Sequence, residues 1–276
     1  MKDPALTIAT ALLLLFTPFV ACTAEAVTPH TAGVLTIGSD LSYPPYYSLQ
    51  DGKAVGFGPE LMRALSSELE LEPDFVNTRF AQLILRLKSD RFDVIASALY
   101  ITPARSRQID FIPVFQTGNV LISRTNGYQA KTLKDLCGHR AGVIQGGSVI
   151  EKLEHKARNI CPEGESITLR QFPSAPGATQ ALLARAVDAQ IIDAAVAQQT
   201  VEHLGSRVSV TSSELMFPVP VGLGINKNAT ALRAALTAAL ATIKADGRYT
   251  KLLNEYGLSA PNDKLVAQAL GQTDDI

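Results

Sequence analysis

Groups that carry out common enzyme chemistry are largely missing from this sequence. Its four histidines, at positions 30, 139, 155 and 203, show no spacing typical of metal-ligand pairs, and it contains no Cys-x-x-Cys. It has neither a Walker phosphate loop nor a Gly-x-Ser-x-Gly nucleophile motif. Tryptophan is absent, and aromatic residues make up only 6% of the chain. We therefore expect no metal, no cofactor and no bond-breaking activity.

An excess of basic charge is also missing. The chain has 25 Lys and Arg against 26 Asp and Glu, a formal net charge of −1, and no basic run interleaved with aromatic residues. Nucleic acid is therefore not expected as a partner. At 276 residues, of which 46% are hydrophobic and 18% charged, the sequence is typical of a globular protein, long enough for one large domain or two small ones.

Only one long apolar run is present, from Ala5 to Ala21. It follows a short charged start and is interrupted by Pro18, a pattern that predicts a secretory signal peptide over residues 1–26 and export to the periplasm. A transmembrane anchor is the alternative, but the run is short for crossing a bilayer. Cleavage after Ala26 would release a soluble protein, whereas Phe19-Val-Ala-Cys22 resembles a lipobox and would leave a lipid on Cys22.

From residue 33 onward, short β-rich runs alternate with segments of helical periodicity. This alternation predicts parallel sheets with right-handed crossovers. It forms two series, the first before residue 97 and the second after residue 139. The expected strands are 34–37, 74–76, 92–96, 140–144, 166–169 and 189–192, and the expected helices are 59–71, 81–87, 148–158, 178–186, 230–245 and 248–256.

Two β-rich passages, residues 115–122 and 217–225, connect the two series. Two crossings between compact units make a hinge. The sequence therefore predicts an α/β protein with two lobes, each with a parallel-rich sheet and helices on both faces, joined by a two-strand hinge. We place lobe 1 at residues 27–116 plus 219–260, lobe 2 at 120–216, and a polar tail at 261–276.

Arg105 occupies an unusual place in this pattern. The apolar run Val94 to Ile101 predicts a strand, Thr102 is suited to cap a helix, and Pro103 suits its first turn. Arg105 then falls at the positive end of the helix dipole, where a cation is unfavourable by roughly 0.3–1 kcal/mol. Its planar fork of donors suits a carboxylate. The alternative is a solvated surface arginine, as expected for the neighbouring Arg107.

Two further candidates follow predicted strands of the second series. Gln145-Gly-Gly-Ser148 opens a helix, so its backbone N–H groups and the Ser148 hydroxyl would form a cradle for an anion. An ordinary capped turn is the alternative. Asp193 ends a later strand and is placed to cap the helix that starts at Ala194, whereas Asp188 fits a structural position before that strand.

These segments together resemble the extracytoplasmic solute-binding proteins of ABC importers, family 3, which bind polar amino acids. The resemblance extends over residues 33–258. It implies the type II two-lobed periplasmic binding-protein fold, and a monomeric protein that encloses an amino acid or related small carboxylate and delivers it to a membrane permease. It is carried by Asp93–Arg105, Tyr43-Pro-Pro-Tyr46, Val55-Gly-Phe57, Leu182–Asp193 and Lys244-Ala-Asp-Gly247.

The resemblance also implies a role for each candidate residue. Arg105 and Ser148 would hold the ligand carboxylate. Asp193 would receive its ammonium group, and Asp40 would reach the far end of the ligand. The full predicted ligand set is Asp40, Tyr43, Tyr46, Phe57, Ser97, Ala98, Tyr100, Arg105, Gln145, Gly146, Ser148 and Asp193.

Several alternatives stay open within that set. Tyr46 and Phe57 could belong to the core instead of the site. Ala98 and Tyr100 stand where many relatives have glycine, serine or threonine, which implies fewer hydroxyl contacts and a smaller pocket. Among the cysteines, Cys137 and Cys161 remain as an even pair if Cys22 is removed or lipidated; in an oxidising compartment a disulfide between them would stabilise the fold by roughly 3 kcal/mol. Two buried thiols are the alternative.

Two other functions are compatible with the same scaffold. Periplasmic cyclohexadienyl dehydratases, which act on prephenate or arogenate, resemble this family and also need an arginine for a carboxylate. They need in addition an acid or base over the substrate, and only Asp40 or Asp193 could be assigned that role. A sensory protein that presents its ligand to a receptor would use the same pocket and differ in its outer surface.

Overall fold

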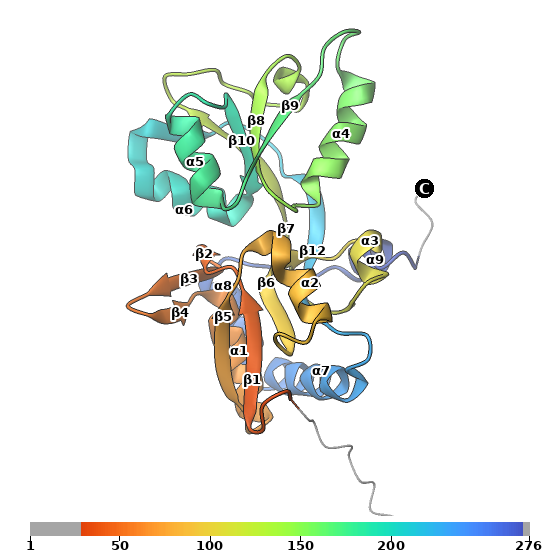
Figure 1. The fold of residues 1–276 in the computed structure, drawn as a ribbon. Helices are drawn as coiled ribbons and strands as arrows, with labels where there is room; N and C mark the ends of the chain where they lie inside the picture. Colours follow the sequence, from red (N-terminus) through yellow and green to blue (C-terminus); the bar gives the residue numbers. More distant parts are fainter. Residues whose placement is uncertain (1–28, 273–276) are drawn as a thin grey trace, which may run out of the picture.

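The computed structural model describes residues 29–272. The predicted signal peptide and the lipid site at Cys22 lie outside the described residues. Figure 1 shows two lobes, one above the other, with the strands β7 and β12 passing between them. Each lobe has its own arrangement of strands and helices, and the two arrangements are alike.

Lobe 1 is built around a parallel three-strand unit. Its middle strand is β1 (Val34–Ser39), which pairs in parallel with β5 (Glu72–Asn77) and with β6 (Val94–Tyr100). A small antiparallel sheet of β2 (Ser42–Tyr43), β3 (Tyr47–Gln50) and β4 (Lys53–Val55) precedes α1 (Phe57–Glu68). The helical segments that follow before the hinge are the 3-10 turn η1 (Phe80–Gln82), α2 (Leu83–Lys88) and α3 (Pro103–Ser106).

Lobe 2 repeats this plan. Its middle strand β8 (Arg140–Ile144) pairs in parallel with β9 (Thr168–Phe172) and with β10 (Ala189–Asp193). The connecting helices are α4 (Val149–Ile160), α5 (Ala175–Leu183) and α6 (Ala194–Leu204); η2 (Lys134–Leu136), η3 (Gly205–Arg207) and β11 (Val208–Val210) complete the lobe. Helix α5 begins three residues before the predicted start because Ser174 caps it, accepting a hydrogen bond from Gly177 N at 3.2 Å.

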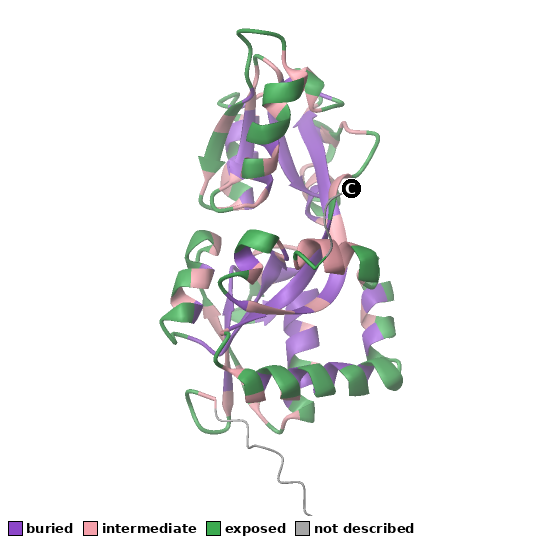
Figure 2. Cartoon of the chain, turned by 90° about the vertical axis from the view of Figure 1, so that its right-hand side faces the viewer, coloured by how far each residue is buried: buried purple, intermediate pink, exposed green. Residues whose placement is uncertain are grey.

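The hinge consists of two long antiparallel strands, β7 (Asp110–Arg124) and β12 (Met216–Ile225). They stay paired from Asp110–Ile225 to Asn119–Met216, with register shifts on the way. Because β12 also pairs with β6 and β7 with β10, hydrogen bonding runs continuously from one lobe into the other. The predicted fold class is confirmed, with the refinement that the two lobe sheets are joined through the hinge. Buried strands accordingly run through both lobes and the connection in Figure 2.

The chain after the hinge returns to lobe 1. Helices α7 (Thr230–Ala245) and α8 (Arg248–Glu255) pack against α1. The segment predicted as a polar tail contains a further helix, α9 (Asp263–Ala269), whose half-buried residues pack against β12. The Asn262 side chain caps it, accepting a hydrogen bond from Leu265 N at 3.2 Å. The few apolar residues in this segment therefore suffice to fix a short helix, although they form no long periodic pattern.

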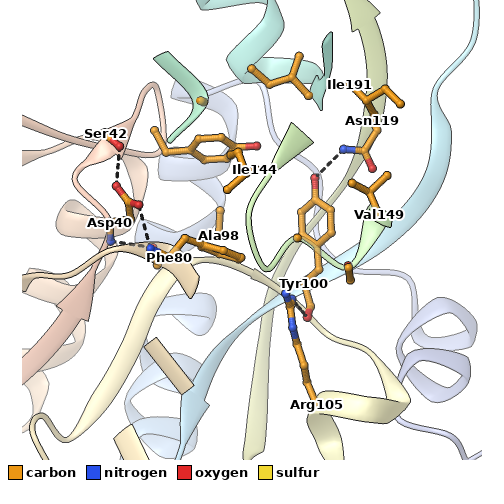
Figure 3. A pocket seen from close by; sticks show the side chains of 16 residues that line it. Asp40, Ser42, Phe80, Ala98, Tyr100, Arg105, Asn119, Ile144, Val149 and Ile191 are labelled. Carbon is orange, nitrogen blue, oxygen red and sulfur yellow. Dashed lines mark hydrogen bonds between the residues drawn. The ribbon is translucent and has the colours of Figure 1, made fainter. Parts of the chain in front are cut away.

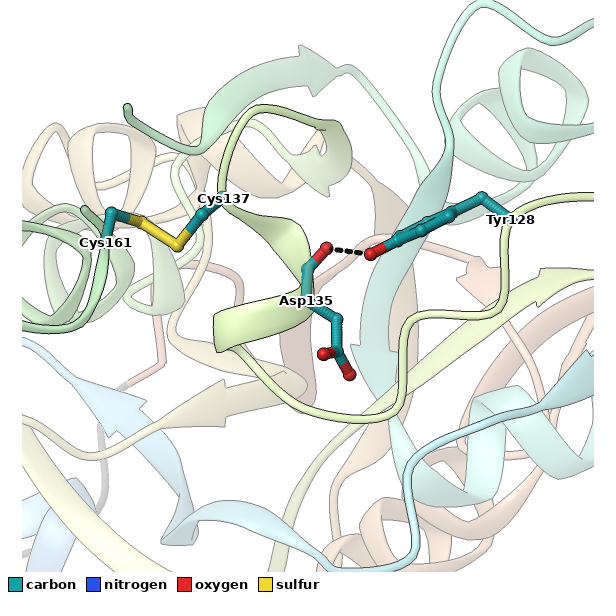
Figure 4. The surroundings of a disulfide bond; sticks show 4 residues. All are labelled: Tyr128, Asp135, Cys137 and Cys161. Carbon is teal, nitrogen blue, oxygen red and sulfur yellow. Dashed lines mark hydrogen bonds between the residues drawn. A yellow bond between two sulfur atoms is a disulfide. The ribbon is translucent and has the colours of Figure 1, made fainter. Parts of the chain in front are cut away.

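A disulfide joins Cys137 to Cys161, as predicted. The two residues end η2 and α4, and their Cα atoms lie 5.5 Å apart (Figure 4). The bridge therefore ties the far end of α4 to the turn that leads into β8. Near it, the Tyr128 hydroxyl donates a hydrogen bond to the Asp135 carbonyl at 2.6 Å.

Candidate ligand-binding site

A cavity lies between the lobes at the carboxyl ends of strands from both sides, which is where open parallel sheets bind ligands. Its volume is about 50 Å³, room for a few water molecules. Lobe 1 lines it with Asp40, Ser42, Tyr43, Phe80, Ser97, Ala98, Tyr100 and Arg105; the hinge strand β7 contributes Asn119; lobe 2 adds Ile144, Gly147, Ser148, Val149, Ala175, Ile191 and Ile192. Figure 3 shows these side chains around the cavity.

Arg105 is the positive group of the cavity and is only 8% exposed. Its guanidinium donates to the Tyr100 carbonyl at 2.8 Å and to the Gly146 carbonyl of lobe 2 at 3.0 Å, and it lies over the Phe80 ring. Within residues 29–272 no carboxylate forms an ion pair with it. Burial lowers the pKa of Arg105 to about 10. A buried cation met only by neutral carbonyls and an aromatic ring is incompletely compensated, which favours an anion in the cavity.

The helix cap that follows β6 explains how Arg105 reaches the cavity. Thr102 caps α3 by accepting a hydrogen bond from Arg105 N at 3.2 Å, as the sequence predicted for this position. The cap fixes the backbone at the first turn, so the arginine side chain leaves the helix at its N-terminal end. A second cation, Lys152 of α4, lies nearby, and burial followed by the charge of Arg105 lowers the pKa of Lys152.

The turn between β8 and α4 meets Arg105 from the other lobe. Gly146 takes a φ of 77°, and a Cβ added there would lie 3.1 Å from Ala81 of lobe 1, so only glycine permits this approach. Ser148 precedes α4 without capping it, and its Oγ is buried with no hydrogen-bond partner among the described residues. The hydroxyl is thus free for a ligand. Gln145 is exposed and does not line the cavity.

Asp193 does not reach the cavity. Its carboxylate is fully buried and accepts hydrogen bonds from Tyr46 at 2.7 Å, from Tyr100 at 2.8 Å and from Ala195 N at 3.1 Å. The last bond caps α6, as expected, and the two tyrosine hydroxyls come from lobe 1. Burial raises the pKa of Asp193, although these donors oppose the shift. Two hydroxyl groups of lobe 1 therefore donate hydrogen bonds to Asp193, the role that the sequence predicted for a ligand ammonium group.

Asp40 lies in the wall of the cavity, held by its own lobe. Its carboxylate accepts hydrogen bonds from the Ser42 hydroxyl at 2.5 Å and from Phe80 N at 3.0 Å, while its backbone N–H donates to Ser97 Oγ at 2.9 Å. These bonds fix its orientation and leave capacity for a further donor. Tyr43 lies beside it in the wall.

Two predicted aromatic residues belong to the core instead. Phe57 is fully buried, with its ring 5.1 Å from that of Phe115 and 5.8 Å from that of Tyr256. It starts α1, whose first turn faces the hinge strand and not the cavity. The Tyr46 ring packs at 4.9 Å from Phe115, and only its hydroxyl points toward lobe 2.

The remaining lining residues carried weak sequence signals. Ala98 lines the cavity with a φ of 46°, a conformation that favours glycine. Phe80 and Ser42 follow strands and offered no pattern of their own. The lobe 2 aliphatic residues look like core residues in the sequence. Asn119, a buried polar residue beside the apolar run 120–122, is the one position whose burial could have been noticed from sequence.

Two lobes joined by a two-strand hinge enclose a cavity with a buried cation. This arrangement defines a two-lobed solute-binding protein. Residues 35–259 match the bacterial extracellular solute-binding proteins, family 3. The chain therefore belongs to this family, as the sequence resemblance predicted. The ABC transporter arginine-binding protein 1 of Escherichia coli K12 is 30% identical over 227 residues, which span 80% of this chain and 90% of the relative.

Solved structures agree with this assignment. An ancestral arginine-binding protein bound to glutamine superposes with a TM-score of 0.75 at 27% identity, covering 82% of this chain and 99% of the other. An ancestral amino acid-binding protein described as a precursor of cyclohexadienyl dehydratase gives a TM-score of 0.70 at 26% identity, covering 81% and 95%. Within residues 29–272, no helix is both long and apolar enough to cross a membrane.

Proposed function

We propose that this protein captures a small carboxylate, an amino acid or a related compound, between its lobes in the periplasm and delivers it to the membrane permease of an ABC importer. The observation that carries the proposal is that Arg105 and Ser148 line the same cavity from opposite lobes. Among the residues that the structure describes, Arg105 is a buried cation without an ionic partner, and Ser148 Oγ is a buried hydroxyl without a hydrogen bond. A carboxylate would satisfy both.

The two groups come from different lobes, which gives the ligand its effect on closure. Arg105 belongs to lobe 1 and Ser148 to lobe 2. A carboxylate that contacts both binds the closed form more tightly than an open one, and it shifts the population by that difference in affinity. Ligand and lobe closure are therefore coupled through a single anionic group.

The relatives support the transport role. The matched Escherichia coli protein is named for an ABC transporter and for arginine. A dehydratase would need an acid or base over the substrate. Asp193 is sealed by two tyrosine hydroxyls, and both oxygens of Asp40 accept hydrogen bonds within lobe 1. This arrangement favours binding over catalysis, and incubation with prephenate or arogenate, with product detection, tests it.

A thermal-shift screen over amino acids and small carboxylates tests the binding function. A ligand present at about a hundred times its dissociation constant should add about 2.7 kcal/mol to the free energy of unfolding. Small-angle scattering with the hit should show a smaller radius of gyration than without it. The proposal fails if no carboxylate stabilises the protein, or if a hit binds equally well to an Arg105→Ala variant. Co-purification with permease or receptor components separates transport from sensing.

A further inference from the structure

The acidic residue placed to receive a ligand ammonium group already has its partners. One oxygen of Asp193 accepts hydrogen bonds from Tyr46 and Ala195 N, and the other accepts one from Tyr100. The residue is 0% exposed and is not part of the cavity wall. Most of the hydrogen-bonding capacity of the carboxylate is thus used by the protein itself.

Tyr100 forms the barrier between Asp193 and the cavity. Its ring lines the cavity while its hydroxyl donates to Asp193 at 2.8 Å. Its carbonyl also accepts from the Arg105 guanidinium, so the ring stands next to the place where a ligand carboxylate would lie. Figure 3 shows the ring beside Arg105, reaching up to Asn119. An ammonium group on the carbon next to the carboxylate would meet this ring and not an acid.

The other acid of the cavity, Asp40, already accepts hydrogen bonds from the Ser42 hydroxyl and from Phe80 N of its own lobe. In Figure 3 Asp40 lies on the opposite side from Arg105, with Ala98 and Phe80 between them. An α-ammonium group is separated from its carboxylate by only one carbon, so a carboxylate held at Arg105 would place it beside the Tyr100 ring, whereas Asp40 lies beyond Ala98 and Phe80 (Figure 3). The remaining wall includes Ile144, Val149 and the neutral Asn119 amide, which donates a hydrogen bond to the Tyr100 hydroxyl.

Charge balance leads to the same conclusion. A ligand carboxylate compensates the charge of Arg105, whereas an ammonium group beside the Tyr100 ring would add a buried positive charge close to Arg105, which already has Lys152 as a cationic neighbour. Burial also raises the pKa of Asp193, whose carboxylate is held by the hydroxyl group of Tyr100 and is not part of the cavity wall.

From this arrangement we infer that the site selects carboxylates that lack an α-ammonium group, in contrast to an amino acid site. The inference rests on the proposed carboxylate-binding function and specifies its ligand class. It concerns only the carbon next to the carboxylate, because the far end of the ligand would face Asp40, on the opposite side of the cavity from Arg105 (Figure 3).

Calorimetry with two matched pairs tests the inference. Pentanoate and norvaline differ only in the α-ammonium group, and so do 5-aminopentanoate and ornithine. In the parent protein the acid without that group should bind about tenfold or more tightly within its pair, since an unpaired buried charge costs at least that much. Equal binding, tighter binding of the α-amino acid, or binding of none of the four compounds overturns the inference.

Variants of Tyr100 test whether its ring causes the preference for acids without an α-ammonium group. Tyr100→Ser removes the ring and exposes Asp193, so the preference for pentanoate over norvaline should shrink by about tenfold. Tyr100→Phe keeps the ring and should keep the preference, whatever the absolute affinities. An unchanged preference in folded Tyr100→Ser contradicts the role of the ring, and the parent pairs still decide if that variant does not fold. Arg105→Ala separates the two proposals, because loss of binding there upholds carboxylate capture even when norvaline proves the better ligand.

Discussion

The two lobes share one internal arrangement and differ in what they present to the cavity. In each, an aspartate just before the third parallel strand holds the backbone of the middle strand: Asp93 accepts from Thr36 N at 2.8 Å, and Asp188 accepts from Arg140 N at 3.0 Å. The cavity faces are unlike. Lobe 1 provides a cation, an acid and aromatic rings, whereas lobe 2 provides aliphatic side chains and one hydroxyl. The scaffold is common, and specificity resides in side chains at the strand ends.

The two charged groups at the interface between the lobes, Asp193 and Arg105, receive different partners from the opposite lobe. The acid of lobe 2, Asp193, receives two hydroxyl groups from lobe 1. The cation of lobe 1, Arg105, receives only a neutral carbonyl from lobe 2. Contact between the lobes therefore satisfies the acid and leaves the cation dependent on a ligand. The tests below probe this asymmetry, beginning with the largest expected effect.

Arg105→Ala should abolish measurable binding of a micromolar ligand. Truncating one partner of a desolvated charge pair costs about 2–5 kcal/mol, which is roughly a thirtyfold to several thousandfold loss of affinity. Calorimetry on the folded variant measures it. Arg107→Ala is the matched control, because Arg107 is exposed two residues away and its charge is solvated. If the control is the damaging change, the site is assigned to the wrong arginine.

Replacing both Cys137 and Cys161 by serine should lower the free energy of unfolding by about 3 kcal/mol, the value expected from chain entropy for a loop of this length. The bridge spans 24 residues of lobe 2, whereas the described part of lobe 1 has no cysteine. Lobe 1 instead buries five large aromatic rings completely, those of Tyr46, Tyr47, Phe57, Phe92 and Phe115. Lobe 2 thus adds a disulfide to a largely aliphatic core, whereas the core of lobe 1 contains most of the large buried aromatic rings.

Differential scanning calorimetry gives the size of that loss, and hydrogen exchange shows where it falls. Faster exchange should be confined to η2, β8 and the end of α4. The parent protein treated with reductant is the control and should match the double variant. An unchanged unfolding midpoint in both would show that the bridge adds no stability to lobe 2.

The sequence alone predicted much of this comparison. Alternating strands and helices with two connecting passages defined the two lobes, because that periodicity is local. Arg105 was identified because a cation at a helix N-terminus breaks a local rule. The contacts of Asp193 with Tyr46 and Tyr100 could not be predicted, since they join residues 147 and 93 positions apart and depend on the direction of two side chains. The aliphatic wall of lobe 2 was indistinguishable from core for the same reason.

Ala98→Gly should stabilise lobe 1 by about 1 kcal/mol, because Ala98 holds a φ of 46° that costs a residue with a Cβ about that much. Thermal unfolding measures the change. Ala96→Gly is the control: it lies two residues earlier in the same buried strand with ordinary backbone, and it should destabilise by about 0.5–1 kcal/mol. A loss of stability in both variants would show that the backbone at Ala98 carries no strain.

The smallest expected effect concerns Asp188 of lobe 2. The hydrogen bonds and charge of Arg140 lower the pKa of Asp188 to about 2, below the value of about 3.9 for an unfolded aspartate. Since the folded pKa is the lower one, the stabilisation is present above about pH 4 and is lost as the pH falls toward 2. The pair is partly solvated, so the loss in Asp188→Asn at pH 7 should be a few tenths to about 1 kcal/mol. Denaturant unfolding of parent and variant should therefore differ at pH 7 and converge near pH 2. Arg140→Gln should reproduce the difference, and the double variant should lose no more than either single one; a gap that persists at pH 2 would assign the effect to packing and not to charge.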